Sequence, residues 1–306
     1  MRMRRKPNLI PRMERCSRVL ISDPEVQRGN WRALMPEAET VYLELGCGKG
    51  RFTAETAEQN PKALYIAVER VPDAMVIAME RVCAKELHNV FFVDGDAAQL
   101  PQFFAPGEVS RIYINFCDPW PGNRHAKRRL THPDFLLRYR QVLSEDGEIH
   151  FKTDNRDLFE WSLFQFPRAG FTLSQVTRDL HAGGICGVMT DYEEKFHSLG
   201  TPINRCVAAV GPLPEPEEPS ETPDNLYVKE NRPRRYTAGT VRLSINPPAE
   251  GFGGKDSVKG NRQGSLSRWI NNFLKLQKSF KKFVSLAKRL FRQADRPRRI
   301  GGDGFF

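Results

Sequence analysis

Short apolar runs alternate with amphipathic segments between residues 40 and 210 of this 306-residue chain. Each apolar run has the length of a buried strand, and the segments 52–58 and 73–87 place apolar side chains at helical spacing. Strands that alternate with helices along the chain predict an α/β fold with a mainly parallel sheet. The expected strands are residues 41–45, 64–68, 90–93, 111–116, 148–151, 171–176 and 206–210.

Glycines and carboxylates stand at the ends of the first four expected strands. In chain order, they are Glu44, Gly46, Gly48, Gly50, Glu69, Asp96 and Asp118. Because α/β proteins bind ligands beyond the carboxyl ends of their parallel strands, we expect these residues to lie at one site. Glycine lets the backbone approach a ligand closely, and a carboxylate after the second strand can accept both hydroxyls of a ribose. The pattern therefore predicts an adenosyl cofactor.

The spacing of the glycines distinguishes between cofactors that contain adenosine. Glycines at 46, 48 and 50 do not match the dinucleotide pattern G-x-G-x-x-G, and the sequence contains no phosphate-binding G-x-x-x-x-G-K-[ST] pattern. A ring of carboxylates would repel a pyrophosphate, whereas it suits the sulfonium and ammonium groups of S-adenosylmethionine. We therefore expect a methyl donor rather than NAD.

A stiff aromatic segment follows the fourth of these strands. Pro119 and Pro121 flank Trp120 directly after Asp118, and both prolines restrict the backbone around the indole. The basic side chains that follow at once are Arg124, Lys127, Arg128 and Arg129. Aromatic side chains stack on unpaired bases, and cationic side chains neutralise phosphates. The segment therefore predicts a nucleobase attached to phosphates as the ligand.

Together these motifs closely resemble the bacterial tRNA (guanine-N7-)-methyltransferase family over residues 1 to about 212. Other matching stretches are residues 1–4 with Lys6 and Pro7, residues 151–155 (FKTDN) and residues 189–196 (MTDYEEKF). The resemblance implies a class I methyltransferase fold, which is a Rossmann-like sheet flanked by helices. It also implies S-adenosylmethionine as the cofactor and a guanine of the tRNA variable loop as the methyl acceptor.

The resemblance also implies roles for individual residues. The carboxylates that it places beside the cofactor are Glu44, Glu69, Asp96 and Asp118, and it makes Asp118 the catalytic residue. The positions that it assigns to substrate contact are Asp154, Thr190, Asp191, Tyr192 and Glu193. One position departs from the family: Gly122 stands where members usually carry a lysine. One cation near the substrate is therefore missing, and Arg124 could compensate for it.

The net charge of +10 is distributed unevenly. Residues 1–212 carry a net charge of +1, whereas residues 213–306 carry +9. The first part is therefore expected to be an ordinary enzyme with local basic patches, and the excess charge belongs to a C-terminal extension. The first eighteen residues contain seven basic side chains and one acidic side chain, and we expect them to be disordered without RNA.

Composition divides the chain into six segments. They are a basic N-terminal arm (1–35), the methyltransferase domain (36–212), an acidic proline-rich linker (213–224), a poorly defined segment with a possible strand pair (225–264), a basic amphipathic helix (265–293) and a basic, glycine-containing tail (294–306). The amphipathic helix could dock on the protein itself, bind tRNA or contact an anionic membrane. We favour tRNA because the rest of the chain already indicates an RNA substrate.

Several classes of protein are not indicated by the sequence. The six cysteines form no C-x-x-C pair and no Cys/His cluster with zinc spacing, so we expect no metal site. No apolar run approaches the roughly 20 residues that cross a bilayer, and no hydrophobic stretch follows the basic N-terminus. We therefore expect a protein of the reducing cytoplasm.

Two alternative functions stay open at this point. The methyl acceptor could be an exocyclic amine of a base, although families of that kind carry an Asp/Asn-Pro-Pro-aromatic motif with the aromatic residue at another position. The chain could also bind RNA without catalysis, with Gly122 as a mark of lost activity. The retained ring of carboxylates argues against this second alternative.

Overall fold

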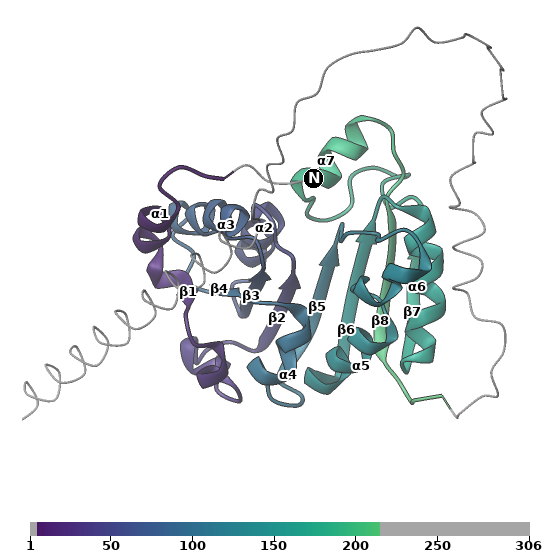
Figure 1. The fold of residues 1–306 in the computed structure, drawn as a ribbon, viewed down its shortest axis with the longest axis horizontal. Helices are drawn as coiled ribbons and strands as arrows, with labels where there is room; N and C mark the ends of the chain where they lie inside the picture. Colours follow the sequence, from purple (N-terminus) through teal and green to yellow (C-terminus); the bar gives the residue numbers. More distant parts are fainter. Residues whose placement is uncertain (1–4, 215–306) are drawn as a thin grey trace, which may run out of the picture. The chain divides into compact units, whose positions relative to one another are not determined.

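An eight-stranded sheet organises residues 5–214, the part of the chain that the computed structural model describes (Figure 1). The strand order is β1-β4-β3-β2-β5-β6-β8-β7. Neighbours from β1 to β6 are parallel, whereas β8 is antiparallel to both β6 and β7. The strands are β1 (Leu20–Ile21), β2 (Thr40–Leu45), β3 (Ala63–Glu69), β4 (Val90–Asp94), β5 (Val109–Asn115), β6 (Leu143–Thr153), β7 (Phe171–Thr177) and β8 (Asn204–Val210).

Helices cover both faces of the sheet (Figure 1). One face carries α1 (Leu9–Arg15), α2 (Arg51–Gln59) and α3 (Pro72–Ala84). The other face carries α4 (Leu100–Phe103), α5 (Pro133–Val142) and α6 (Arg156–Arg168). The last helix within the described residues, α7 (Asp191–Ser198), lies beyond the carboxyl ends of β5 and β6 (Figure 1).

Each face of the sheet has its own hydrophobic core. On β3, every residue is buried, and successive side chains point to opposite faces. Leu64 and Ile66 therefore join the core beneath α5 and α6, while Tyr65 and Ala67 join the core beneath α2 and α3. Burial on both faces is why the strand is continuously apolar in sequence, as is usual in parallel sheets.

The α/β fold with a mainly parallel sheet is confirmed. Each of the seven expected strands is present, and the largest difference in extent is at β6, which begins at Leu143 rather than at residue 148. Strand β1 is not predicted from the sequence, because a strand of two residues is too short to show an alternating pattern.

Disorder was expected for the first eighteen residues, and this prediction is wrong for residues 9–18, which are folded. Helix α1 packs on α3, where Arg12 forms an ion pair with Glu80 at 2.6 Å. The chain then adds β1 to the sheet and buries Trp31 completely, with the indole Nε1 donating to the carbonyl of Phe103 at 2.9 Å. Pairing with acidic groups elsewhere offsets the repulsion within this basic segment, so the segment is part of the folded unit.

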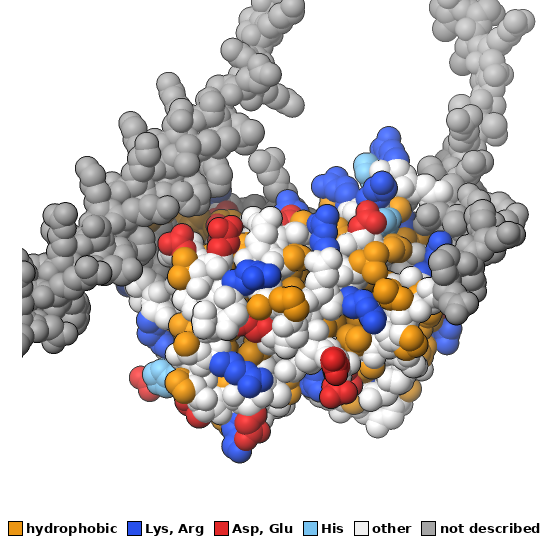
Figure 2. Space-filling view, turned by 90° about the horizontal axis from the view of Figure 1, so that it is seen from below, with side chains coloured by type: hydrophobic (Ala, Val, Ile, Leu, Met, Phe, Trp, Pro, Cys, Tyr) orange, Lys and Arg blue, Asp and Glu red, His pale blue; other side chains and the backbone are white. Residues whose placement is uncertain are grey.

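The surface at the amino ends of the strands shows no large patch of one charge (Figure 2). Basic and acidic side chains alternate there with apolar ones. Within residues 5–214, no helix is both long enough and apolar enough to cross a bilayer. The expected linker beyond residue 214, the strand pair at 225–264, the amphipathic helix and the tail lie outside the described residues.

Candidate active site at the carboxyl ends of the strands

The loop between β2 and α2 contains the three glycines of the cofactor motif. Gly46, Gly48 and Gly50 have φ values of +77°, +57° and +73°, which side chains rarely adopt. A Cβ at Gly50 would lie 2.4 Å from the Cβ of Ala78, so this glycine lets α2 pack directly on α3. A Cβ at Gly46 or Gly48 would meet nothing within 4 Å. The first two glycines therefore border open space that a ligand can enter, while the third serves packing.

Glu69 fixes this loop to the end of β3. One carboxylate oxygen accepts a hydrogen bond from the Gly48 N–H at 2.9 Å, and the other accepts from the Val71 N–H at 2.8 Å. Asp94 ends the next strand in register with Glu69, and burial together with the Glu69 charge raises the pKa of Asp94. Asp96 caps the following turn through the Ala98 N–H at 2.9 Å. Carboxylates from two strands thus line one side of the glycine loop.

Glu44 is placed differently from the other expected cofactor residues. Its carboxylate is buried beneath α2 and accepts hydrogen bonds from Thr53 Oγ1 at 2.6 Å and from Tyr65 and Asn115 at 3.3 Å each. Burial raises the pKa of Glu44, and these three hydrogen bonds oppose that rise. All of its described contacts are with protein groups that join α2 to the sheet.

The segment after β5 presents Asp118 and Trp120 at the adjoining strand end. Phe116 and Trp120 have φ values of +52° and +43°, an uncommon conformation for residues other than glycine. Between them, burial raises the pKa of Cys117 to about 12, with smaller contributions from the charges of Asp118 and Asp154. Asp118 itself is exposed to solvent. The strained turn therefore places the exposed Asp118 carboxylate and the half-buried Trp120 indole next to the end of β2, the strand that leads into the glycine loop.

The basic residues after Trp120 divide into an exposed set and a buried one. Arg124, Lys127 and Arg128 are exposed, and the Arg128 guanidinium lies 3.5 Å from the centre of the Trp120 ring. Arg129 is completely buried, donates to the Trp120 carbonyl from Nε at 3.3 Å and from Nη2 at 3.2 Å, and stacks over Trp161 at 4.3 Å. The expected substrate contact of Arg129 conflicts with this burial, because its guanidinium faces protein groups and supports the tryptophan turn.

The expected substrate segment forms the beginning of α7. Thr190 Oγ1 accepts from the Glu193 N–H at 2.9 Å, and the Glu193 carboxylate accepts from the Thr190 N–H at 3.2 Å, which is a reciprocal capping box. Glu193 is completely buried, whereas the Tyr192 ring is 56 % exposed. Tyr192 is therefore accessible from solvent, and Glu193 holds the start of the helix.

Lys152 anchors Glu193 from the neighbouring strand β6. Its ammonium donates to Glu193 at 2.6 Å and to the Val188 carbonyl at 3.1 Å, and His181 contacts the other Glu193 oxygen at 3.1 Å. Burial lowers the pKa of Lys152, and the Glu193 charge opposes this effect. Neither residue is predicted as a site residue from the sequence, because His181 stands in no motif and Lys152 is only one residue of the FKTDN stretch.

Asp154 follows β6 at the same edge of the sheet. Since Asn115 pairs in register with Lys152, the segments after β5 and β6 begin side by side. Asp154 is half-buried, and this burial raises the pKa of its carboxyl group. The structure thus brings Asp118 and Asp154 to adjacent strand ends.

A cavity of about 360 Å³ borders this region on the face that carries α2. It lies between α2, the strands β5 to β8 and the loop before α7, and its lining includes Phe52, Tyr113, Asn115, Lys152, Val188 and Arg205. It therefore shares Lys152 with the anchor of α7. Within residues 5–214, no group of three or more His, Cys, Asp or Glu side chains is arranged to hold a metal ion.

Comparisons with known proteins agree with this arrangement. A family described as putative methyltransferases matches residues 38–206. The tRNA (guanine-N(7)-)-methyltransferase of Geobacillus kaustophilus (strain HTA426) is 45 % identical over 213 residues, which are 69 % of this chain and 98 % of that protein. The enzyme of the same name from Bacillus cytotoxicus is 45 % identical over 209 residues, which are 68 % of this chain and 96 % of its own. The chain therefore belongs to the tRNA (guanine-N7-)-methyltransferase family.

Proposed function

We propose that this protein transfers the methyl group of S-adenosylmethionine to N7 of a guanine in the variable loop of tRNA. The observation that carries the proposal is the placement of the exposed Asp118 and the half-buried Trp120 at the strand edge that also holds the open glycine loop. Family membership supports the same reaction, and tRNA as the substrate supports a cytoplasmic protein.

The residues present fit S-adenosylmethionine as the cofactor. Gly46 and Gly48 leave open space, and Glu69 with its neighbour Asp94 supplies negative charge beside that space, whereas Asp96 forms an ion pair with Arg70 at 3.0 Å. When bound, the cofactor supplies a methyl group on a positively charged sulfur. Carboxylates in this position attract the cationic groups of the cofactor and would repel a pyrophosphate.

Guanine N7 carries a free lone pair, so the protein does not need a base to remove a proton from it. The transfer leaves a positive charge on the purine, and a fixed negative charge nearby favours the transition state over the substrate. We therefore assign Asp118 an electrostatic and orienting role. Trp120 gives the base a rigid surface to stack on, and the buried Arg129 fixes the Trp120 backbone by donating two hydrogen bonds to its carbonyl.

The test is methylation of bulk tRNA, followed by nucleoside mass spectrometry. We expect 7-methylguanosine as the product, and Asp118→Asn should lower kcat about 100-fold to 1000-fold without a change in thermal unfolding. Asp146→Asn, which alters an exposed carboxylate in β6, is the matched control and should be fully active. A methylated exocyclic amine would instead support the alternative acceptor, and near-normal turnover of Asp118→Asn would refute the electrostatic role.

The proposal extends to the surface that binds tRNA. Arg124, Lys127 and Arg128 are exposed beside Trp120 and are suited to phosphates. The basic residues beyond 214 are assigned to tRNA as well, because residues 213–306 carry a net charge of +9 and the proposed substrate is a polyanion.

Truncation after residue 214 should therefore leave cofactor affinity and kcat unchanged but weaken tRNA binding. Each lost phosphate contact should reduce the slope of log affinity against log salt by about 0.7 to 0.9. Equal tRNA affinity and equal slope for both proteins would exclude an RNA role, and binding of only the full-length protein to anionic vesicles would then indicate a membrane role.

A further inference from the structure

Helix α7 has little apolar anchorage of its own. It is eight residues long, and its single buried residue is Glu193. So short a helix is marginal in isolation, because nucleation is costly and few hydrogen bonds repay it. Two ring contacts support it, the stacking of Phe196 on Phe116 at 6.3 Å and the edge-on packing of His197 against His181 at 4.9 Å. The position of α7, and with it the Thr190–Glu193 segment, must therefore depend strongly on polar contacts.

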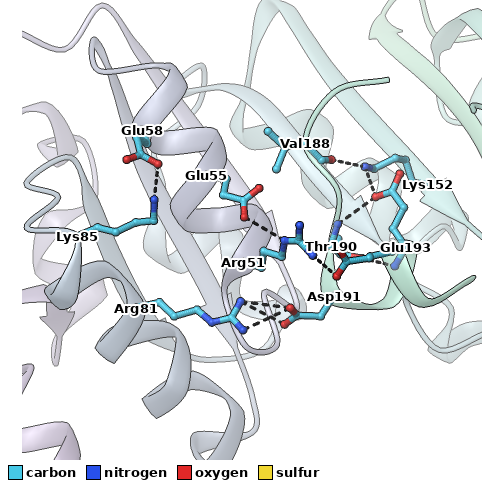
Figure 3. Close-up of polar contacts among 11 residues, drawn as sticks. Arg51, Glu55, Glu58, Arg81, Lys85, Lys152, Val188, Thr190, Asp191 and Glu193 are labelled. Carbon is cyan, nitrogen blue, oxygen red and sulfur yellow. Dashed lines mark hydrogen bonds and ion pairs between the residues drawn. The ribbon is translucent and has the colours of Figure 1, made fainter. Parts of the chain in front are cut away.

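Three ion pairs join α7 to three different elements (Figure 3). Lys152 on β6 pairs with Glu193 at 2.6 Å in the interior. Arg81 on α3 pairs with Asp191 at 3.3 Å. Arg51 on α2 pairs with Glu194. Three carboxylates within four consecutive residues thus meet cations from a strand and two helices, which fixes both the location of α7 and its rotation.

The two outer pairs connect α7 to the cofactor side of the molecule. Arg51 directly follows Gly50 of the cofactor loop, and its guanidinium is also held by Glu55 at 3.0 Å. The Arg81 and Asp191 side chains are 37 % and 35 % exposed, so their pair is partly screened by solvent. Each outer pair contributes little to global stability. Loss of one would nevertheless leave α7 held by the buried Lys152–Glu193 pair and a single outer pair, so its rotation would be less restricted.

We propose that Arg51 and Arg81 are positioning residues for methyl transfer, and that they act through Glu194 and Asp191 to hold the Thr190–Glu193 segment over the guanine site. The inference rests on the proposed function for its effect on catalysis. It also revises the expected role of Asp191, which serves to place the segment through Arg81 rather than to touch the substrate.

The experiment compares Arg81→Ala, Asp191→Ala and the charge-swapped double variant Arg81→Asp/Asp191→Arg. Each single variant should raise the KM for tRNA about threefold to tenfold, while the Kd for S-adenosylmethionine from calorimetry stays the same. The swapped variant should recover to within about twofold of wild type. Because the swap keeps the net charge of the protein constant, recovery separates placement of α7 from simple attraction of phosphates.

Lys85→Ala is the matched control. Lys85 directly follows α3, the helix that carries Arg81, but it pairs with Glu58 on α2 rather than with α7 (Figure 3). Its loss removes the same charge at the end of the same helix, and the KM for tRNA should not change. An equal rise of KM in Lys85→Ala, or a swapped variant as impaired as the single variants, would overturn the positioning role.

Hydrogen exchange gives a readout that does not depend on catalysis. Amides of residues 190–198 should exchange faster in Arg81→Ala and Asp191→Ala than in wild type and in Lys85→Ala, with the rest of the sheet unchanged. Unchanged exchange in α7 would refute the inference even in an active enzyme. Faster exchange without any 7-methylguanosine from the wild type would support the placement of α7 and count against the proposed function alone.

Discussion

The carboxyl ends of the strands form an edge of the sheet with two halves, and different interactions hold each half in place. We call the ends of β2, β3 and β4 the cofactor half, and the ends of β5 and β6 together with α7 the substrate half. On the cofactor half, the loop after β2 is fixed by the close approach of Gly50 to Ala78 and by backbone N–H groups that donate to Glu69. On the substrate half, the turn around Trp120 rests on the buried Arg129, and α7 rests on ion pairs. Steric fit and backbone hydrogen bonds thus hold the part of the edge to which we assign the cofactor. Charged side chains hold the part to which we assign the base, and these interactions respond more readily to pH, salt and substitution.

The largest expected effect comes from overpacking the cofactor half with Gly50→Ala. The added Cβ would meet Ala78 at 2.4 Å and would also sit at a φ of +73°. Overpacking and left-handed strain together should cost about 4 kcal/mol, and cofactor binding should be lost with them. Thermal or urea unfolding measures the loss of stability. Gly107→Ala is the control, because its φ of +75° brings the same strain with nothing within 4 Å, and it should cost only about 1 kcal/mol.

A smaller effect should follow from removal of the buried guanidinium on the substrate half. Arg129→Met loses two charge-assisted hydrogen bonds to the Trp120 carbonyl, so we expect a loss of about 2 kcal/mol in unfolding free energy and a lower kcat. Arg128→Met keeps the fold, because Arg128 is exposed, and should only weaken tRNA binding. If Arg129→Met unfolded at the wild-type temperature and lost only tRNA affinity, the distinction between the two arginines would be wrong.

The smallest expected effect is a pH dependence of the unfolding free energy, and it should arise in the substrate half alone. Burial lowers the pKa of His150 on β6 from 6.5 to about 4. Between these values the unfolded chain binds a proton that the folded protein does not, so stability rises with pH there and is lost as the pH falls from 6.5 towards 4. At pH 5.5 the loss from this group should be about 1.4 kcal/mol.

His150→Gln should flatten that dependence in urea unfolding curves recorded between pH 7 and pH 5. The strands β2, β3 and β4 of the cofactor half contain no histidine. Hydrogen exchange at pH 5.5 should therefore accelerate first around β6 and β8. Equal acceleration in both halves would contradict the assignment to His150.

Much of the fold and part of the site were predictable from local sequence. The strands from β2 to β8 were expected because their apolar runs are long enough to show periodicity, and the glycine loop was expected because its motif is contiguous. Arg128 and Arg129 are neighbours of the same type, and no local pattern shows that one is exposed and the other completely buried. The burial of Glu44 was likewise not predictable from the sequence. It depends on hydrogen bonds from Thr53, Tyr65 and Asn115, which belong to three different elements of the fold.

The sequence by itself determined the class of fold, the cofactor motif and the family, because these depend on periodicity and on short stretches of residues whose spacing is fixed by covalent geometry. Only the tertiary structure decided which charges meet. Arg81 and Asp191 are 110 residues apart, and Arg51 and Glu194 are 143 residues apart, so their pairing follows from sheet order and helix placement. A charged side chain has the same character in sequence whether it pairs, faces solvent or is buried, and the distances that separate these outcomes arise only when the chain has folded.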